Sequence, residues 1–423
     1  MAESPSDGSG PAVADANHAV AERVYTRDFW LVFIATSALN TAANLFVLFP
    51  VFVVRLGGGA STIGAVAALA AFGALSMRPA ASTVIERRGR RWTAMWFLAL
   101  SAAANCAYLA IGSLGWPLYA VAMLNGVANG AVRVALFTMV YPLLPEGRAG
   151  EAMAIFSLSG QGPASFGALL GELIVHFFGF TGLFLSAGAI TLMAALLVAM
   201  VTPDDPAAGS ARVGLAMADG AAEAPAAGYR ALLTNRALMP LWFATVVFSL
   251  AISSRPSFVA PFAYARGIRS VGVYFTVYGL VAVAVRLNAR RFDQIGVERL
   301  LAPALAILGI GIGCVAATGH CGMLELAAAI GGFGHGIAYP ALSALVIRNT
   351  PPRTAGRTST IYTSIADLCG MAGPFGLGML AHGVGYPAMF LAAGAAGLVG
   401  AIVLAVAGGR RVAAPATSWR GSH

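Results

Sequence analysis

Two arginines that lie deep inside long apolar stretches are the residues in this sequence best suited to bind a ligand. Arg133 and Arg255 have no charged counterpart in the other half of the chain, where Tyr339 aligns with Arg133 and Asn44 roughly with Arg255. A charge at the centre of a membrane helix costs roughly 2.5–3.5 kcal/mol, so each needs a role. Because arginine can clamp a carboxylate or phosphate, we expect both to bind an anionic solute. The alternative is an ion pair of either arginine with Asp367.

Three other ionisable side chains are candidates to carry a proton. Asp367 is flanked by apolar residues and glycine, where burial disfavours the charge of a carboxylate; beside an arginine it would stay ionised and be structural. His335 is a second candidate, and its alternative role is a neutral histidine bonded to a backbone carbonyl. Glu172 is a third, although a surface pair with His176, four residues later on the same helix face, is the favoured interpretation.

Uncharged polar side chains recur at one-turn spacing in the apolar stretches. Asn40 and Asn44 form one such pair and Asn125 and Asn129 another. Amides at the middle of a membrane either bond between helices or line a cavity. We expect Asn40 and Asn44 to line a solute cavity together with Tyr339, whose alternative role is packing, and leave both options open for Asn125 and Asn129.

The sequence lacks the motifs of the common enzyme and nucleotide-driven classes. All 26 basic residues are arginine, so the lysine of a phosphate-binding GxxxxGK[ST] loop is absent. There is no HExxH or GxSxG motif and no Cys/His metal cluster. The net charge of +9 is scattered between apolar stretches rather than gathered in one domain, which argues against nucleic-acid binding. We therefore expect no enzyme activity, cofactor or metal.

The elements that must position these side chains are membrane-spanning helices. Of the 423 residues, 58% are hydrophobic and 10% are charged, against about 25% charged in soluble domains. A spanning helix needs about 20 mainly apolar residues. Such stretches occur twelve times, at about 29–54, 61–84, 93–112, 117–143, 152–178, 181–201, 238–263, 270–289, 300–318, 322–347, 358–381 and 385–408. The sequence thus predicts an all-α membrane protein with twelve transmembrane helices.

Domain boundaries and orientation follow from composition. We expect a disordered tail at 1–27, six-helix bundles at 28–202 and 237–408, a linker at 203–236 and a second tail at 409–423. With the N-terminus inside, the inner segments hold nineteen arginines and the outer loops three. The positive-inside rule therefore predicts that both termini are cytoplasmic.

Three sets of residues recur in the same order in both halves. The sets are related by offsets of 206, 207 to 208, and 211 residues. This order predicts two halves in parallel topology, related by a pseudo-two-fold axis along the membrane normal. The related sets are Gly126, Gly130, Pro145 and Gly150 with Gly332, Gly336, Pro351 and Gly356; Arg78, Glu86 and Gly89 with Arg286, Asp293 and Gly296; and Gly162, Pro163 and Gly167 with Gly373, Pro374 and Gly378.

These repeats suggest structural roles for their members. The Gly-x-x-x-Gly elements are expected close-packing sites between helices. Arg78 and Arg286 are expected either to snorkel toward the cytoplasm or to pair with acids at an inner gate. The carboxylates of Glu86 and Asp293 are expected to latch this gate by accepting hydrogen bonds from a helix N-terminus. Gly162-Pro163 and Gly373-Pro374 are expected hinges.

The stretch from Arg78 to Arg91 resembles the loop between the second and third helices of the major facilitator superfamily, in which an acid precedes a basic residue, a glycine and further basic residues. Glu86, Arg87, Gly89 and Arg90 match that pattern. The Gly-Pro elements are similar to the fifth-helix motif of that family. The resemblance implies two six-helix bundles that rock around a central cavity, with this loop acting as a gate. Ala122 stands where proton-coupled drug exporters of the family usually carry an arginine.

The resulting functional hypothesis is alternating-access transport. We expect a monomer that uses a proton or other ion gradient to export a small anionic or zwitterionic metabolite or drug across the inner membrane. Alternatives are an uptake permease and a non-transporting protein of the same fold that acts as a sensor or assembly factor. A lipid flippase is disfavoured by the polar residues at the membrane midplane.

Overall fold

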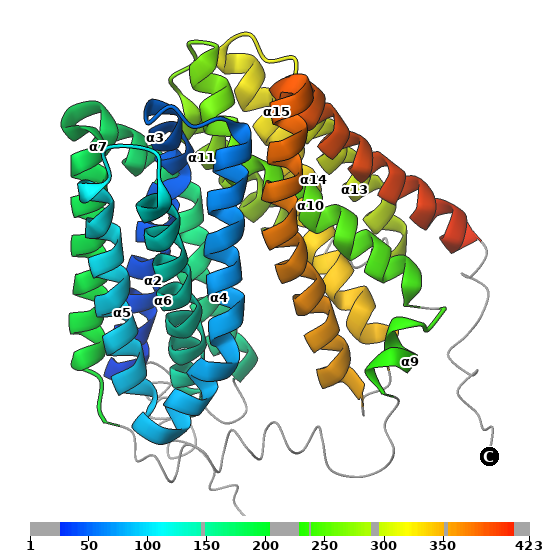
Figure 1. The fold of residues 1–423 in the computed structure, drawn as a ribbon. Coiled ribbons are helices and arrows are strands. Elements are labelled where there is room, and N and C mark those ends of the chain that lie inside the picture. The colour runs from blue at the N-terminus through cyan, green and yellow to red at the C-terminus, as the bar shows by residue number, and fades with distance from the viewer. Residues whose placement is uncertain are drawn as a thin grey trace, which may run out of the picture.

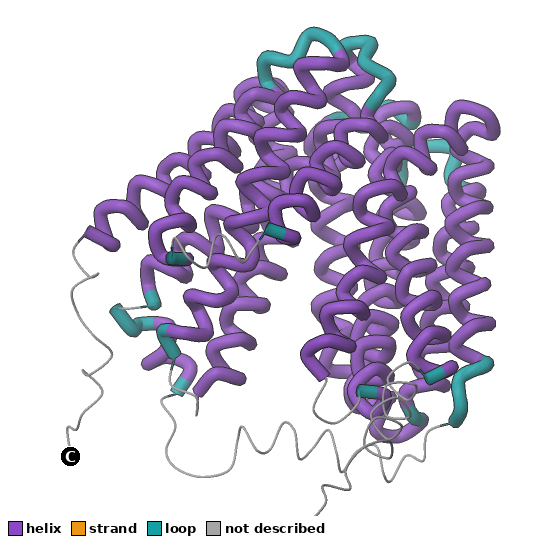
Figure 2. The backbone as a smooth tube through the Cα atoms, turned by 180° about the vertical axis from the view of Figure 1, so that it is seen from behind, coloured by secondary structure: helices purple, strands orange, loops and turns teal. Residues whose placement is uncertain are grey.

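Every regular element that the structure describes is a helix (Figure 2). The computed structural model describes residues 26–144, 149–203, 228–236, 238–288, 296–350 and 354–409. The helices are α2 (Arg27–Leu45), η1 (Phe46–Leu48), α3 (Phe49–Arg55), α4 (Ala60–Arg88), α5 (Arg90–Ala107), η2 (Tyr108–Ala110), α6 (Trp116–Val140), η3 (Tyr141–Leu143), α7 (Ala149–Ala199), α9 (Tyr229–Leu233), α10 (Met239–Ala265), α11 (Val271–Leu287), α13 (Val297–Val315), α14 (Cys321–Arg348) and α15 (Ala355–Gly409). The prediction of an all-α membrane protein is confirmed. Most of the predicted linker and both predicted tails lie outside the described residues.

The two longest helices are each broken once by a glycine. Gly179 in α7 and Gly385 in α15 have φ values of 65° and 87°, in the left-handed region that glycine adopts without steric cost. Nine helices among the described residues are long and apolar enough to cross a membrane, and α11 is a shorter apolar helix. Dividing α7 and α15 at these glycines gives the twelve apolar segments that the sequence predicts. That all twelve cross the bilayer stays a prediction.

The helices form two groups, α2 to α7 and α10 to α15, which meet near one end and diverge toward the other (Figure 1). The groups are joined by two seams, in which α4 packs against the first segment of α15 and the first segment of α7 packs against α11. The end at which the groups meet carries the turn between α3 and α4. The opposite, divergent end carries the turn between α4 and α5.

The repeated glycines occupy equivalent places in the two groups. A methyl group at Gly126 or Gly130 of α6 would overlap the carbonyl of Ala70 or Ala74 in α4. In the second group, Gly332 of α14 is equally close to the backbone of α11. The expected close-packing role of both Gly-x-x-x-Gly elements is therefore confirmed.

The seams show a further equivalence that the sequence reading missed. Gly64 of α4 touches the carbonyl of Pro374, and Gly272 of α11 touches the backbone of Leu169. These glycines are 208 residues apart, the same offset that separates Arg78 from Arg286. Both seams are therefore built on a glycine that lets the helices approach closely.

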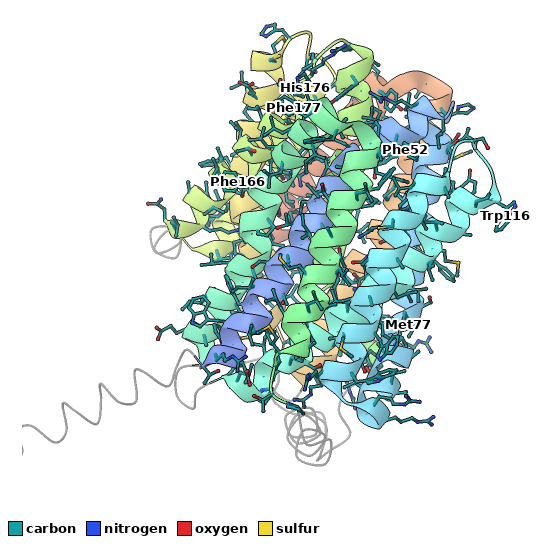
Figure 3. All side chains as sticks on the ribbon, turned by 90° about the vertical axis from the view of Figure 1, so that its left-hand side faces the viewer. Phe52, Met77, Trp116, Phe166, His176 and Phe177 are labelled. Atoms are coloured by element: carbon teal, nitrogen blue, oxygen red, sulfur yellow. The ribbon has the colours of Figure 1, made fainter. Side chains whose placement is uncertain are left out.

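Large apolar side chains cover the outside of the helix bundle. Phe166, Phe177 and Trp116 are 47%, 71% and 80% exposed and project outward in Figure 3. The most apolar windows of the candidate spans are only 28% to 61% buried. A soluble monomer rarely exposes contiguous apolar surface on this scale, whereas lipid tails cover it without penalty.

Candidate functional site

An ion pair joins the two groups of helices. Arg78 of α4 donates from both terminal nitrogens to the carboxylate of Asp367 in α15, with Nη2 3.0 Å from Oδ1. The two side chains are 43% and 28% exposed, so the pair is not sealed within the protein. Arg133 of α6 is also exposed, although it lies within a long apolar helix, and α6 packs against α4, the helix that carries Arg78. An ion pair therefore lies at the α4–α15 seam, with a third ionisable group on the neighbouring helix α6.

This pairing corrects the expected alternative in which Asp367 pairs with Arg133 or Arg255. The first segment of α15 packs against α4, which brings Arg78 to the carboxylate. The expectation that Arg78 pairs with an acid is met. Asp367 thereby lies beside an arginine, the arrangement in which the sequence reading assigns it a structural role, and its part in proton transfer stays a proposal.

A second carboxylate links the groups at the α7–α11 seam. Glu172 of α7 accepts hydrogen bonds from the backbone N–H groups of Val271 and Gly272, at 3.2 and 2.7 Å, and the Tyr264 hydroxyl lies 3.5 Å away. A carboxylate at a helix N-terminus satisfies unpaired N–H groups and interacts favourably with the helix dipole. The favoured surface pair of Glu172 with His176 is wrong, because His176 is exposed and packs edge-on against Phe177 (Figure 3).

Arginines and aromatic rings cluster inside the second group, where α10, α11 and α14 converge. The Arg255 guanidinium carbon lies 3.5 Å from the centroid of the Tyr278 ring. The Tyr278 ring is 5.5 Å from the imidazole of His335, and His335 is 6.2 Å from the ring of Tyr339. The guanidinium carbon of Arg286 lies 5.4 Å from the Tyr339 ring. The predicted residues Arg255, Tyr339 and His335 are thus brought together, and Arg286 joins them.

The amides of the first group form a hydrogen-bonded chain beside a cavity of about 230 Å³. Asn129 donates to Asn125 at 2.5 Å, Asn125 donates to Asn105 at 2.6 Å, and Asn105 donates to Thr191 at 3.2 Å. The chain ties α6 to α5 and to the second segment of α7, and its four members line the cavity. The cavity is otherwise mainly apolar.

The other amide pair packs against α7 instead. Asn40 donates to the backbone oxygens of Thr36 and Ser159, and Asn44 donates to the oxygen of Asn40. Asn44 also lies directly opposite Gly167 of α7. Neither side chain lines the cavity of the first group. Contact of these two amides with a solute stays a prediction.

The expected gate residues of the first group lie at the turn between α4 and α5, at the divergent end. Glu86 and Arg87 are exposed, and Gly89 with φ 84° makes the turn into α5. Gly296, with φ 92°, precedes α13 in the same way, so the repeat extends to backbone geometry. Arg90 is buried. Asp293 lies outside the described residues.

At the expected hinges the helices are continuous. Helix α7 runs through Gly162 and Pro163, and α15 runs through Gly373 and Pro374. Gly373 packs against Ser253 of α10, while Gly162 has open space around it. A hinge role for these residues stays a prediction.

Two polar residues of these clusters were missed from the sequence. Tyr278 was not singled out, although its position two turns before Arg286 places both on one helix face. Asn105 lies in a predicted span that has no charged side chain, so no charge marked that span as functional. Polar side chains of any kind in apolar helices would have been the more complete signal.

Known proteins were compared with this sequence and fold. A protein sequence 25% identical over 360 residues, an uncharacterised MFS-type transporter of Burkholderia mallei, matches 82% of this chain and 83% of its own length. An uncharacterised MFS-type transporter of Salmonella typhimurium is 29% identical over 161 residues; that match spans 38% of this chain and 41% of the relative. The shorter match thus covers less than half of that relative.

Solved structures share the fold. The nucleoside transporter NupG superposes with a TM-score of 0.72 at 13% identity, covering 90% of this chain and 99% of that one. A POT family transporter in complex with a thioalcohol-conjugated peptide gives a TM-score of 0.70 at 12% identity, with 91% and 96% covered.

The family profile completes the comparison. The sequence profile of the Major Facilitator Superfamily matches residues 30–374 and 269–421, two overlapping matches that together span both groups of helices. Paired helix groups, repeated glycines and the match agree with one another. The chain belongs to the major facilitator superfamily and is a membrane transporter rather than an enzyme.

Proposed function

We propose that this transporter exports a small anionic or zwitterionic organic solute across the inner membrane by alternating access, in exchange for protons. It acts as a monomer with both termini in the cytoplasm. The single observation that carries the proposal is the ion pair between Arg78 and Asp367, which joins the two moving groups through an acid that can be protonated.

The ion pair supports proton coupling through thermodynamic linkage. Protonation of Asp367 removes the negative charge that binds Arg78 and so weakens the α4–α15 seam. Conversely, a rearrangement that separates the pair leaves a carboxylate without its cation, which favours proton uptake. Arg133 lies on α6, which packs against the helix that carries Arg78. In the proposed cycle, an anionic solute binds Arg133 and is released when the protonation state of Asp367 changes.

The shape of the molecule fits a conformation open to the cytoplasm, which an export cycle and an uptake cycle share. The helix groups diverge at the end that carries the turn between α4 and α5 (Figure 1). The positive-inside rule assigns that end to the cytoplasm, because the inner segments hold nineteen arginines against three in the outer loops. A solute would then enter from the cytoplasm in this conformation and leave after the groups close there.

The first experiment compares metabolites inside and outside cells that lack, carry or overproduce the transporter. Export predicts a compound that accumulates inside the deletion strain and is depleted from its medium. A compound left in the medium would favour the uptake permease, and no difference under several growth conditions would favour the non-transporting sensor.

Coupling is then tested with the identified compound in inverted membrane vesicles. We expect transport to release protons from the acidified lumen in the parent, and Asp367→Asn to abolish proton-driven accumulation while solute exchange continues. Arg348→Gln, in an exposed ion pair with Glu298 at 3.6 Å, is the matched control and should transport normally. Proton-driven accumulation in Asp367→Asn would disprove the role of this acid.

A further inference from the structure

The arginine–aromatic cluster of the second group carries an unusual number of unpaired polar atoms. Seven buried side-chain polar atoms in the described chain lack a hydrogen-bond partner, and five belong to this cluster. They are Nε and Nη1 of Arg255, the Tyr278 hydroxyl, Nε of Arg286 and Nδ1 of His335. A buried polar group without a partner costs about 1–3 kcal/mol, and more when it is charged. Such a concentration indicates that something absent from the bare chain pairs with these atoms.

The charge of the cluster is also unbalanced. Within the described ranges, no ion pair involves Arg255 or Arg286, so both guanidinium groups of the cluster lack a carboxylate partner. The ring of Tyr278 stabilises the Arg255 charge from its face, and Tyr339 does the same for Arg286. A ring face accepts no in-plane N–H group, so the edge donors of both guanidinium groups remain available.

The internal repeat identifies what is missing. Arg78 and Arg286 occupy equivalent positions in the second spans of the two halves. Arg78 has Asp367 from the fifth span of the other half, whereas the counterpart of Asp367 is Gln161 at the 206-residue offset and Phe156 at the 211-residue offset, so neither register supplies an acid. Arg78 of the first half therefore has an acid from the second half, whereas the first half offers Arg286 no acid at the equivalent position. A bound anion would give Arg286 the negative charge and hydrogen-bond acceptors that the Asp367 carboxylate gives Arg78.

We infer that Arg255, Arg286, Tyr278 and His335 form a binding site for the anionic group, a carboxylate or phosphate, of the transported solute. The two arginines supply charge and fork-shaped donors, and Tyr278 and His335 supply single donors. Tyr339, which is 46% exposed, marks the open side of the site. Arg286, expected from the sequence to be a gate residue, is reassigned here to ligand binding.

The inference rests on the proposed function only in identifying the bound anion with the transported solute. Binding itself is tested without transport. The melting temperature of the detergent-solubilised, full-length protein is measured in acetate, inorganic phosphate or chloride at tens of millimolar and constant ionic strength. We expect acetate or phosphate to raise Tm above the chloride value by roughly 2 °C or more, since a ligand that binds only the folded state stabilises it.

The variants assign that shift to the site. Arg255→Gln and Arg286→Gln should each lose it, and Tyr278→Phe, which keeps the ring beneath Arg255 but removes the hydroxyl, should reduce it. Arg230→Gln, an exposed arginine of α9, is the control and should keep it. In chloride, Arg255→Gln should melt at or above the wild-type temperature, because it removes a buried, unpaired cation. A purely structural arginine would instead lower Tm in all three salts.

The outcomes separate this inference from the proposed function. No anion-specific shift in the wild type, or equal shifts in the wild type and both arginine variants, would overturn the site. A shift with acetate alone identifies a carboxylate site and a shift with phosphate alone a phosphate site; either supports the inference. If metabolite comparison shows no transport while the shift and its loss persist, the proposed function fails and the anion site stands.

Discussion

At the scale of single residues, the arginines inside the helices differ in the groups that they contact. Arg78 pairs with Asp367 across the seam, Arg133 is exposed on the neighbouring helix α6, and Arg255 lies over an aromatic ring. The sequence identified all three as buried or membrane-embedded charges that need a reason. It did not identify their partners, because Asp367 is 289 residues from Arg78 and the pairing depends on how α15 packs against α4.

Reversal of the ion pair tests its role across the seam. Arg78→Asp and Asp367→Arg should each reduce flux strongly, because each leaves two like charges in contact, and the double variant should recover part of it. Coupling energies for contacting residues are typically 0.5–3 kcal/mol, so a recovery of roughly tenfold over the worse single variant is expected. Flux per molecule in the membrane is the measurement.

The control is the exposed pair of Glu298 and Arg348 within the second group. Reversal of this pair should leave flux unchanged, since exposed ion pairs contribute little. If the double variant of Arg78 and Asp367 is no better than either single variant, charge pairing across the seam is not what these residues contribute.

At the scale of helices, local sequence patterns predicted most of what is observed. Length and hydropathy gave the spans, and the Gly-x-x-x-Gly elements gave the close approaches of α6 to α4 and of α14 to α11. Helix α2 gives way to a short 3₁₀ segment, Phe46–Leu48, just before Pro50, where a proline cannot donate a backbone hydrogen bond. Helix-to-helix pairing across the two halves could not be read from such patterns, because it depends on contacts between distant segments.

Close packing at Gly126 provides the prediction for this scale. Gly126→Ala places a methyl group on the carbonyl of Ala70, so α6 and α4 must separate. Overpacking of this kind costs about 1–3 kcal/mol, and we expect a lower Tm and less protein in the membrane.

A second glycine gives the comparison. Gly376 of α15 has no neighbour within 4 Å of the added methyl group, so Gly376→Ala should be neutral or slightly stabilising, by up to about 1 kcal/mol, through helix propensity. Equal behaviour of the two variants would show that the α4–α6 contact is not tight in the membrane.

At the scale of the whole molecule, the two seams are related by the internal repeat but fastened differently. The α4–α15 seam has an ion pair and the α7–α11 seam has a carboxylate at a helix start. In each, a second-span glycine packs against the fifth span of the other half. The sequence predicted the paired halves but not this difference, because it arises from acids that have no acidic counterpart in the repeat.

A cross-link across the α7–α11 seam should stop transport. The β-carbon of Ser165 lies 3.0 Å from the position a β-carbon would take at Gly279, near the spacing of a disulfide after slight adjustment. With the four native cysteines replaced by serine, Ser165→Cys with Gly279→Cys should lose flux on oxidation and regain it on reduction.

The matching pair lies within one group. The β-carbon of Val247 in α10 lies 3.4 Å from the position a β-carbon would take at Gly400 in α15. Val247→Cys with Gly400→Cys should leave flux intact when oxidised, because this disulfide does not bridge the two moving groups. Continued transport with the seam cross-linked would contradict alternating access by relative motion at α7 and α11.

Glu172 contacts the start of α11 through its side chain on one helix and through main-chain N–H groups on the other, so substitutions in the two helices should differ in effect. Its donors at Val271 and Gly272 belong to the main chain, which every residue except proline provides. Drift at position 271 therefore leaves the bond available, whereas any loss of the acid at 172 abolishes it. Gly272 tolerates less for a separate reason, since a side chain there would meet Leu169. Variants selected for a loosened α7–α11 seam should accordingly include losses of the acid at 172 and added side chains at Gly272, whereas position 271, where the valine is fully buried, should tolerate only apolar residues of similar size.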